Sequence, residues 1–317
     1  MRPSWTKPFS IYNGTVIVGK WNKNSYTIIK ELGFGANGIV YLAQSNKGKV
    51  AIKLSDNSIS ITSEVNVLKS FEKVQGSRLG PSFLDVDDWQ TNKGIVCFYV
   101  MEYIQGPNLL DFVEQKGSVW TEVLMLQLLT NLQALHDNNW IFGDLKPENL
   151  VVSGPPARLR CIDVGGTTQL NRSVKEFTEF FDRGYWAMGS RKAEITYGLF
   201  SVAMVWINIA YPKRFSKNPN DPNQLIHLVK RHPELSKYQS VIIAALQGNF
   251  TSAQEMKDAI INLKSNAYKA PMKMTSNKAM SRVQPTNNQV GRTWKTIGLV
   301  SIIGSVYSYY LFFYLFL

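Results

Sequence analysis

The chain has 317 residues, and its 35 Lys and Arg against 23 Asp and Glu give a formal net charge of +12. Hydrophobic residues make up 44% of it, which excludes a mostly disordered protein, and the length allows one large domain or two modest ones. Only two cysteines occur, both in apolar runs, so a disulfide scaffold is excluded and a reducing compartment is indicated.

A glycine-rich hairpin follows an N-terminal extension of residues 1–25. Gly33, Gly35 and Gly38 lie between two strand-like runs, residues 26–30 and 39–43. Without side chains, the backbone amides of such a hairpin can approach phosphate oxygens closely. The glycine triplet alone fits a plain turn equally well. A second strand follows it, however, where a dinucleotide-binding fold would have a helix.

The next strand, residues 50–53, ends in Lys53. A lysine at a strand end is usually a solvated edge residue, but here it follows Gly33 by 20 residues and can point beneath the glycine hairpin. It then needs a carboxylate to hold it. Apolar residues spaced by three or four predict a helix over residues 61–71, which offers Glu64 as the partner and Glu72 as a weaker one.

Three polar residues stand on one loop between apolar runs: Asp144, Lys146 and Asn149. A further acid, Asp163, follows Asp144 by 19 residues and leaves a strand-like run toward a glycine. Carboxylate and amide oxygens suit Mg²⁺, and another carboxylate can orient a hydroxyl nucleophile. The order and spacing of these four residues predict a site for metal-assisted chemistry on a hydroxyl group.

With these motifs the chain resembles the eukaryotic-like (Hanks-type) Ser/Thr protein kinases over residues 26–263, and most of all the tail-anchored YabT group of spore-forming bacteria. The resemblance implies an α+β, bilobal kinase fold, with a β-rich N-lobe over residues 26–104 and a helical C-lobe over residues 105–264. It also implies ATP and Mg²⁺ as cofactors and protein Ser/Thr side chains as substrates. Sporulation is the setting that the group suggests.

The resemblance assigns a role to each motif residue. Lys53 would grip the α and β phosphates and Glu64 would fix it. Asp144 would orient the substrate hydroxyl, and Lys146 would neutralise the γ-phosphate. Asn149 and Asp163 would hold Mg²⁺. The residues expected around ATP are Gly33, Gly35, Gly38, Val40, Ala51, Lys53, Met101 as gatekeeper, Glu102 and Tyr103.

Three departures from the family pattern bear on regulation. Phe142 and Gly143 replace the His-Arg pair before the catalytic Asp, so a phosphate on the activation segment cannot be captured by that Arg. Residues 184–189 replace Ala-Pro-Glu, and Gly198 replaces an Asp, which predicts a loosely held activation segment. Autophosphorylation is expected among Thr167, Thr168, Ser173 and Thr178.

Two alternatives stay open at this point. One is a catalytically weak pseudokinase scaffold at the membrane, because the helical lobe has lost two polar anchors. The other is a small-molecule kinase of similar fold. The retained Lys53, Asp144 and Asp163 argue against the first alternative, and the Val-Ala-Ile-Lys and Asp-Leu-Lys-Pro-Glu-Asn strings argue against the second.

The C-terminal part differs from the rest of the chain. From Lys264 onward there are seven basic residues and no acid. Residues 265–295 are polar and predict a basic linker, whereas residues 296–317 are uncharged and long enough for a transmembrane helix. The positive-inside rule then predicts a single-pass protein of the cell membrane with a cytoplasmic kinase domain.

The basic linker suits anionic polymers and surfaces. DNA and anionic lipid headgroups are the two partners expected there, and binding to either would concentrate the chain and promote trans-autophosphorylation. Dimerisation of the chain is also expected. Solvated surface remains the alternative interpretation of each short basic run.

Overall fold

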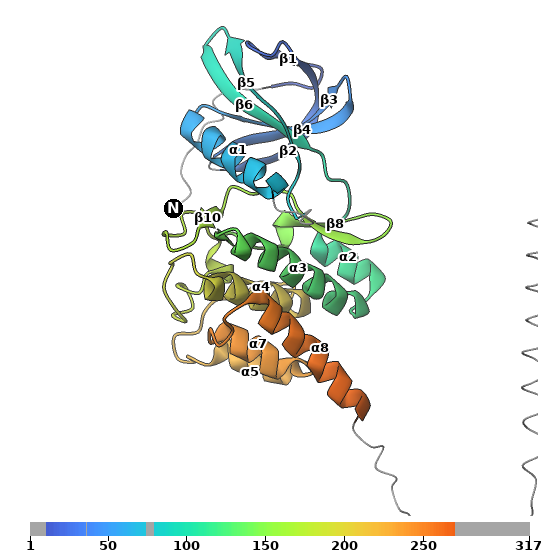
Figure 1. The fold of residues 1–317 in the computed structure, drawn as a ribbon, viewed down its shortest axis with the longest axis vertical. Helices are drawn as coiled ribbons and strands as arrows, with labels where there is room; N and C mark the ends of the chain where they lie inside the picture. The colour runs from blue at the N-terminus through green and yellow to red at the C-terminus, as the bar shows by residue number, and fades with distance from the viewer. Residues whose placement is uncertain (1–10, 36, 74–78, 270–317) are drawn as a thin grey trace, which may run out of the picture. The chain divides into compact units, whose positions relative to one another are not determined.

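The computed structural model describes residues 11–35, 37–73 and 79–269 (Figure 1). The chain divides into two units, residues 1–270 and 271–317, and every described residue belongs to the first. Within this described part, none of the helices combines the length and apolarity that a membrane crossing requires. The predicted transmembrane helix and nearly all of the predicted linker lie outside the described residues.

The N-terminal lobe is one antiparallel six-stranded sheet with one helix. The strand order is β1-β2-β3-β4-β6-β5. The elements are β1 (Val16–Val18), β2 (Ser25–Gly35), β3 (Gly38–Ser45), β4 (Gly48–Ser55), α1 (Ser58–Lys73), β5 (Phe83–Thr91) and β6 (Gly94–Glu102). The sheet starts before residue 26, where the lobe was expected to begin, because β1 pairs Ile17 with Tyr26.

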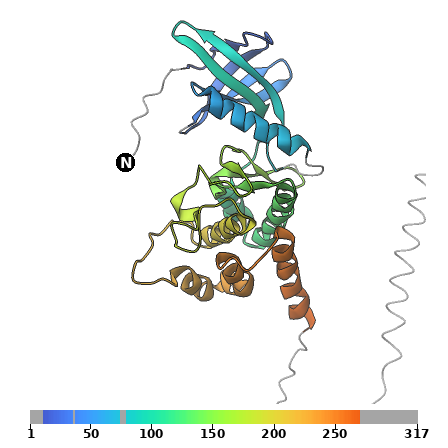
Figure 2. The same ribbon diagram turned by 60° about the vertical axis from the view of Figure 1, so that its left-hand side comes forward.

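Both faces of this sheet are covered, each by different residues. One face buries its own apolar cluster, which includes Ile28, Ile52 and Phe98. The other face receives α1, which lies along the sheet in the turned view (Figure 2). The predicted apolar stripe of this helix is confirmed: Ile61, Val65, Leu68 and Phe71 are all buried.

The C-terminal lobe is mainly helical. Its helices are α2 (Leu109–Lys116), α3 (Val119–Asp137), α4 (Ile195–Ala210), α5 (Gln224–Arg231), α6 (Pro233–Ser236), α7 (Gln239–Leu246) and α8 (Ala253–Lys269). Helix α4 is buried on all sides from Tyr197 to Asn208, as its almost wholly apolar sequence requires, and forms the centre of the lobe.

Short elements at the top of this lobe carry the polar loops. They are β7 (Trp140–Phe142), η1 (Pro147–Asn149), β8 (Leu150–Ser153), β9 (Arg158–Cys161), β10 (Thr167–Gln169) and η2 (Glu179–Phe181). Strand β7 pairs with β10 and β8 pairs with β9, both antiparallel. These elements lie on the side of the lobe next to the N-terminal lobe (Figure 1). The loop between β7 and η1 holds Asp144 and Lys146, η1 holds Asn149, and the loop after β9 holds Asp163.

Candidate active site

The glycine hairpin is the β2–β3 turn. Gly35 and Gly38 form its last cross-strand pair. Gly38 has φ +133°, and a Cβ there would lie 2.3 Å from the Leu54 carbonyl oxygen, so only glycine fits. A Cβ at Gly33 or Gly35 would meet no atom within 4 Å. The backbone of these two glycines is therefore open to a ligand.

Lys53 and Glu64 form a buried ion pair between β4 and α1. The Lys53 Nζ donates to Glu64 Oε2 at 2.6 Å and to Oε1 at 2.8 Å. The Tyr99 hydroxyl on β6 donates to the same Oε2 at 2.7 Å. The structure thus pairs Lys53 with Glu64, while Glu72 accepts a hydrogen bond from the Phe83 amide.

The electrostatic surroundings keep Lys53 charged. Burial alone would lower its pKa, but the Asp163 and Glu64 carboxylates outweigh burial and raise the pKa above the ordinary value of a lysine. The ammonium group is therefore held as a fixed positive charge, which a phosphate ligand requires.

Asp144 and Lys146 lie on the loop between β7 and η1, and they share a third partner. Lys146 donates to the Asp144 carboxylate and, at 3.1 Å, to the Thr178 hydroxyl. The Thr178 hydroxyl in turn donates to Asp144 Oδ1 at 2.8 Å. This closed triangle fixes the orientation of the Asp144 carboxylate, which suits it to accept a proton from an incoming hydroxyl.

Asn149 is the last residue of η1, and Asp163 lies near the start of the loop between β9 and β10. The Asn149 side-chain amide donates to the Asp144 carbonyl oxygen at 3.1 Å, and Asp163 Oδ1 accepts from the Gly165 amide at 2.9 Å. Among the described residues no cluster of three or more His, Cys, Asp or Glu side chains could hold a metal alone. A two-residue oxygen donor set fits Mg²⁺ that completes its coordination with phosphates and water.

Two adjacent glycines show how closely these groups converge. A Cβ at Gly165 would lie 3.2 Å from Asp163 Oδ1, 3.3 Å from Glu176 Oε2 and 3.5 Å from Glu64 Oε1. A Cβ at Gly166 would lie 2.6 Å from the Asp144 Cβ. The carboxylates of Asp163, Glu176 and Glu64 thus lie around Gly165, and the backbone and Cβ of Asp144 lie against the next residue, Gly166.

Four of the residues expected around ATP lie on β3, on β4, at the end of β6 and directly after β6. Ala51 pairs with Met101 and Val40 pairs with Lys53 across neighbouring strands. Ala51 and Met101 are buried, whereas Val40 and Tyr103 are half-buried. The four residues supply apolar surface beside the Lys53 site.

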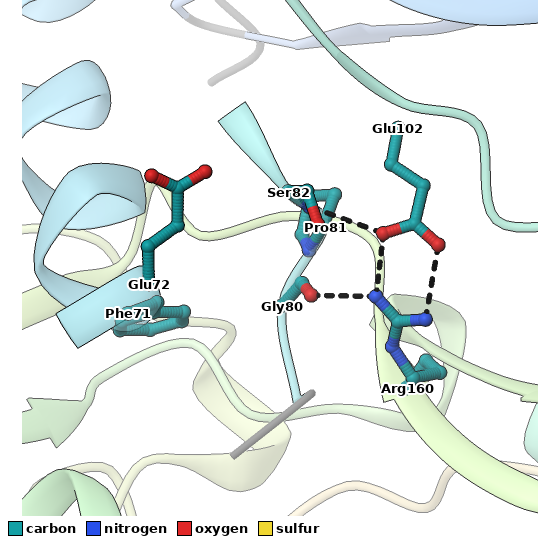
Figure 3. A pocket seen from close by; sticks show the side chains of 7 residues that line it. All are labelled: Phe71, Glu72, Gly80, Pro81, Ser82, Glu102 and Arg160. Atoms are coloured by element: carbon teal, nitrogen blue, oxygen red, sulfur yellow. Dashed lines mark hydrogen bonds and ion pairs between the residues drawn. The ribbon is translucent and has the colours of Figure 1, made fainter. Parts of the chain in front are cut away.

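The Glu102 carboxylate is paired with Arg160. Its carboxylate accepts two hydrogen bonds from Arg160, at 3.1 and 2.8 Å, and one from the Ser82 amide (Figure 3). Burial would raise the Glu102 pKa, but these donors outweigh it and lower the pKa. A cavity of about 270 Å³ adjoins this pair, lined by Phe71, Glu72, Gly80, Pro81, Ser82, Glu102 and Arg160. It contains none of the expected catalytic residues.

Glu176 was not anticipated from the sequence. Its carboxylate accepts a hydrogen bond from Asn37 at the tip of the glycine hairpin. Burial, Glu64 and Asp163 raise the pKa of Glu176, while Lys53 opposes them. Asn37 and Glu176 are 139 residues apart, so no local sequence signal could have joined them. Thr178 was expected only as a phosphorylation site.

The Gly143 substitution has a steric cause. A Cβ at this position would lie 2.5 Å from the Gly166 carbonyl oxygen and 2.7 Å from the Val174 side chain. The Gly143 amide donates to that same carbonyl at 2.9 Å. The chain therefore packs its activation segment against the position where the family has an Arg.

The activation segment has anchors that the sequence pattern did not reveal. Asp182 is fully buried and accepts hydrogen bonds from the Tyr197 hydroxyl and from Arg191. Arg183 binds Glu194 at 2.6 Å and the Ser190 carbonyl oxygen. The expectation of a loosely held segment thus differs from the structure, because a new pair of ionic contacts replaces the missing anchors.

This fold and this arrangement of residues define a protein kinase. The protein kinase domain model matches residues 26–283, and the chain belongs to the protein kinase family. A vaccinia related kinase 3 structure superposes with a TM-score of 0.59 at 16% identity, over 82% of this chain and 93% of that one. At such low identity this likeness shows the fold alone.

Similarity to known kinases identifies the kind of protein kinase more closely. The serine/threonine-protein kinase YabT of Bacillus subtilis (strain 168) is 52% identical over 90% of this chain and 86% of its own length. The serine/threonine-protein kinase sid1 of Schizosaccharomyces pombe is 24% identical over 58% of this chain and 39% of its own. The predicted resemblance to bacterial Hanks-type kinases close to YabT is confirmed, and the chain is a Ser/Thr protein kinase that binds ATP and a divalent metal.

Proposed function

We propose that this kinase uses Mg²⁺ and transfers the γ-phosphoryl group of ATP to Ser or Thr hydroxyls of cytoplasmic proteins and of its own chain. The observation that supports this most is the convergence of Lys53, Asp163 and Asp144 around the Gly165–Gly166 turn. Charge neutralisation and positioning are the two tasks of phosphoryl transfer, and these side chains are placed for both.

Each side chain has one task in the proposed reaction. Lys53, held by Glu64, binds the α and β phosphates. Asn149 and Asp163 would hold Mg²⁺, which when bound neutralises phosphate charge. Asp144 orients the substrate hydroxyl and accepts its proton as the hydroxyl oxygen bonds to the γ-phosphorus, while the bond from that phosphorus to the β-phosphate oxygen breaks and ADP leaves. Lys146 balances the charge on the transferred group. Gly33, Gly35 and Gly38 cover the phosphates.

We further propose that activity does not depend on phosphate capture by residue 143, because Gly143 has no side chain that could bind a phosphate. Among the expected autophosphorylation sites, Ser173 is exposed, Thr168 is half-buried and Thr167 is buried. Thr178 is bound to Asp144. Ser173 is therefore the site favoured by access, and mass spectrometry of the chain after incubation with ATP tests this assignment.

The membrane proposal rests on the sequence outside the described residues. Residues 296–317 are uncharged over a length that suits a bilayer, and the basic residues before them favour a cytoplasmic kinase domain. Fractionation of cells that express the full chain, followed by carbonate extraction, should leave the kinase in the membrane. Recovery in the soluble fraction would contradict single-pass anchoring.

We propose DNA or anionic lipid as the activator that binds the basic linker. The test is phosphorylation by the full chain in neutral nanodiscs, with added duplex DNA or with anionic lipid in the disc. Replacement of Lys269, Lys273, Lys278, Arg282 and Arg292 by Gln should abolish the gain. Equal activity under all these conditions would remove this part of the proposal without touching the kinase chemistry.

A further inference from the structure

Arg214 joins two segments that flank the catalytic triangle. It lies in the loop between α4 and α5, and its guanidinium group binds the carboxylate of Glu148 on η1. The guanidinium carbon also lies 5.0 Å from the ring centre of Phe181 and 5.9 Å from that of Phe180, both on η2. One side chain therefore bridges the catalytic loop and the activation segment.

This bridge stands beside the place where a substrate must bind. Glu148 follows Lys146 by two residues, and Phe180 follows Thr178 by two. Lys146 and Thr178 both donate to the Asp144 carboxylate. A peptide that delivers its hydroxyl to Asp144 must therefore pass its neighbouring side chains close to Arg214 and Glu148.

The negative charge of Glu148 is balanced by another residue of the same chain. Glu148 is exposed, with 54% of its side chain accessible, and could otherwise attract a basic side chain of a substrate. Arg214 neutralises it. The guanidinium is held over the buried rings of Phe180 and Phe181, which restricts it without covering it, since 38% of its side chain stays accessible.

Other cations of the same segments are accessible. Arg172 and Lys175 in the activation segment are exposed, and Lys217 of the α4–α5 loop donates to the Tyr185 carbonyl oxygen at 3.1 Å. A surface ion pair is weak, so an incoming carboxylate can replace Glu148 at Arg214. A basic side chain, in contrast, would have to displace Arg214 from Glu148, and the rings of Phe180 and Phe181 help to hold Arg214 in place.

We propose that Arg214 determines the substrate class of this kinase, and that the kinase prefers Ser or Thr residues flanked by Asp or Glu over those flanked by Lys or Arg. The inference rests on the proposed transfer to protein hydroxyls. Arg214 acts on the flanking residues of the substrate and takes no part in the transfer itself.

Three peptides test this, identical around one Ser except for acidic, neutral or basic flanks. With the full chain we expect kcat/KM for the acidic peptide to exceed that for the basic one at least tenfold, mainly through KM. Arg214→Ala should bring the two values together or reverse their order, because Glu148 becomes free, and Arg214→Lys should retain part of the preference. Glu148→Gln added to Arg214→Ala should remove the gain for the basic peptide.

The neighbouring Lys213→Ala is the matched control, since it removes the same charge from an exposed position. It should change the acidic-to-basic ratio less than about twofold. A wild-type preference for the basic peptide would overturn this inference alone. An acidic-to-basic ratio that is the same in Arg214→Ala as in the wild type would do so too, provided that the variant melts at the wild-type temperature. No transfer to any of the three peptides by the wild-type chain, with duplex DNA and anionic lipid both present, would overturn the proposed function as well.

Discussion

The Lys53 ammonium group and the Glu64 carboxylate are 2.6 Å apart, and both side chains are buried. Such a pair is costly to break, because the remaining charge is left without a partner, whereas replacement of both members by neutral groups is tolerated. The ion pair that we propose as the phosphate-binding group therefore also joins α1 to the sheet.

A double-mutant cycle separates these two effects. Lys53→Met should lower the free energy of unfolding by about 3 kcal/mol, because Glu64 then faces Asp163 and Glu176 without a cation. Lys53→Met combined with Glu64→Gln should recover most of this stability but no kinase activity. Denaturant unfolding measures the first quantity. If the double variant loses the sum of the unfolding free energies that Lys53→Met and Glu64→Gln lose singly, the two side chains are not coupled.

Thr178 should act through orientation of Asp144. Its hydroxyl lies 2.8 Å from Asp144 and 3.1 Å from Lys146. Thr178→Ala should lower kcat about tenfold to a hundredfold with KM for ATP unchanged, and Thr178→Ser should retain most activity because it keeps the hydroxyl. Steady-state kinetics on a protein substrate decide this, and equal losses in both variants would contradict the role.

Glu176 should repel nucleotide when metal is absent. Its carboxylate lies with those of Asp163 and Glu64 around Gly165, where phosphates are expected. Glu176→Gln should tighten binding of ATP in EDTA about threefold to tenfold, or about 1 kcal/mol, because one negative charge is lost. Titration with a fluorescent ATP analogue measures it. Glu179→Gln, an exposed control with the same charge change, should have no effect.

His136 gives the fold a defined sensitivity to acid. Its ring is buried, and within the described residues neither ring nitrogen has a hydrogen-bond partner. It faces Gly198, where a Cβ would lie 3.4 Å from Nε2. Burial lowers the pKa of His136 from 6.5 to about 4, with Asp137 opposing. The unfolded chain therefore binds this proton first as the pH falls.

The sign of the effect follows from that difference. Between pH 7 and pH 5 the unfolded state takes up the proton and the folded state does not, so His136 costs the fold about 2 kcal/mol. Between pH 7 and pH 5, the free energy of unfolding of His136→Leu should fall by about 2 kcal/mol less than that of the wild type. Denaturant unfolding at both pH values measures this difference. His227→Asn, at an exposed histidine, should behave like the wild type. An unchanged loss in His136→Leu would contradict the assignment.

The sequence predicted the features that depend on local pattern. The stripe of α1 follows from apolar spacing, and the glycine hairpin and the Asp144–Asn149 loop follow from residues close together in the chain. The three-residue strand β1 was missed, because it is too short to show an alternating pattern.

The contacts that the sequence did not predict join distant segments. Glu176 binds Asn37 across 139 residues, and Arg214 binds Glu148 across 66. The conformation of the activation segment decides both the Glu176 contact and the Asp182 and Arg183 anchors. That conformation depends on packing against β7 and α4, which residue spacing alone does not encode.

Replacement of Asp144 by Asn in the full-length chain tests the central claim most directly. The substitution keeps the shape of the side chain and one oxygen that can still accept from Lys146. It replaces the other oxygen, to which Thr178 donates, by an NH₂ group and so removes the proton acceptor. We predict that kcat for phosphorylation of a Ser-containing protein falls at least a thousandfold, while ATP binds with unchanged affinity. A kcat within tenfold of the wild-type value would contradict the assignment of Asp144 and the reaction built on it.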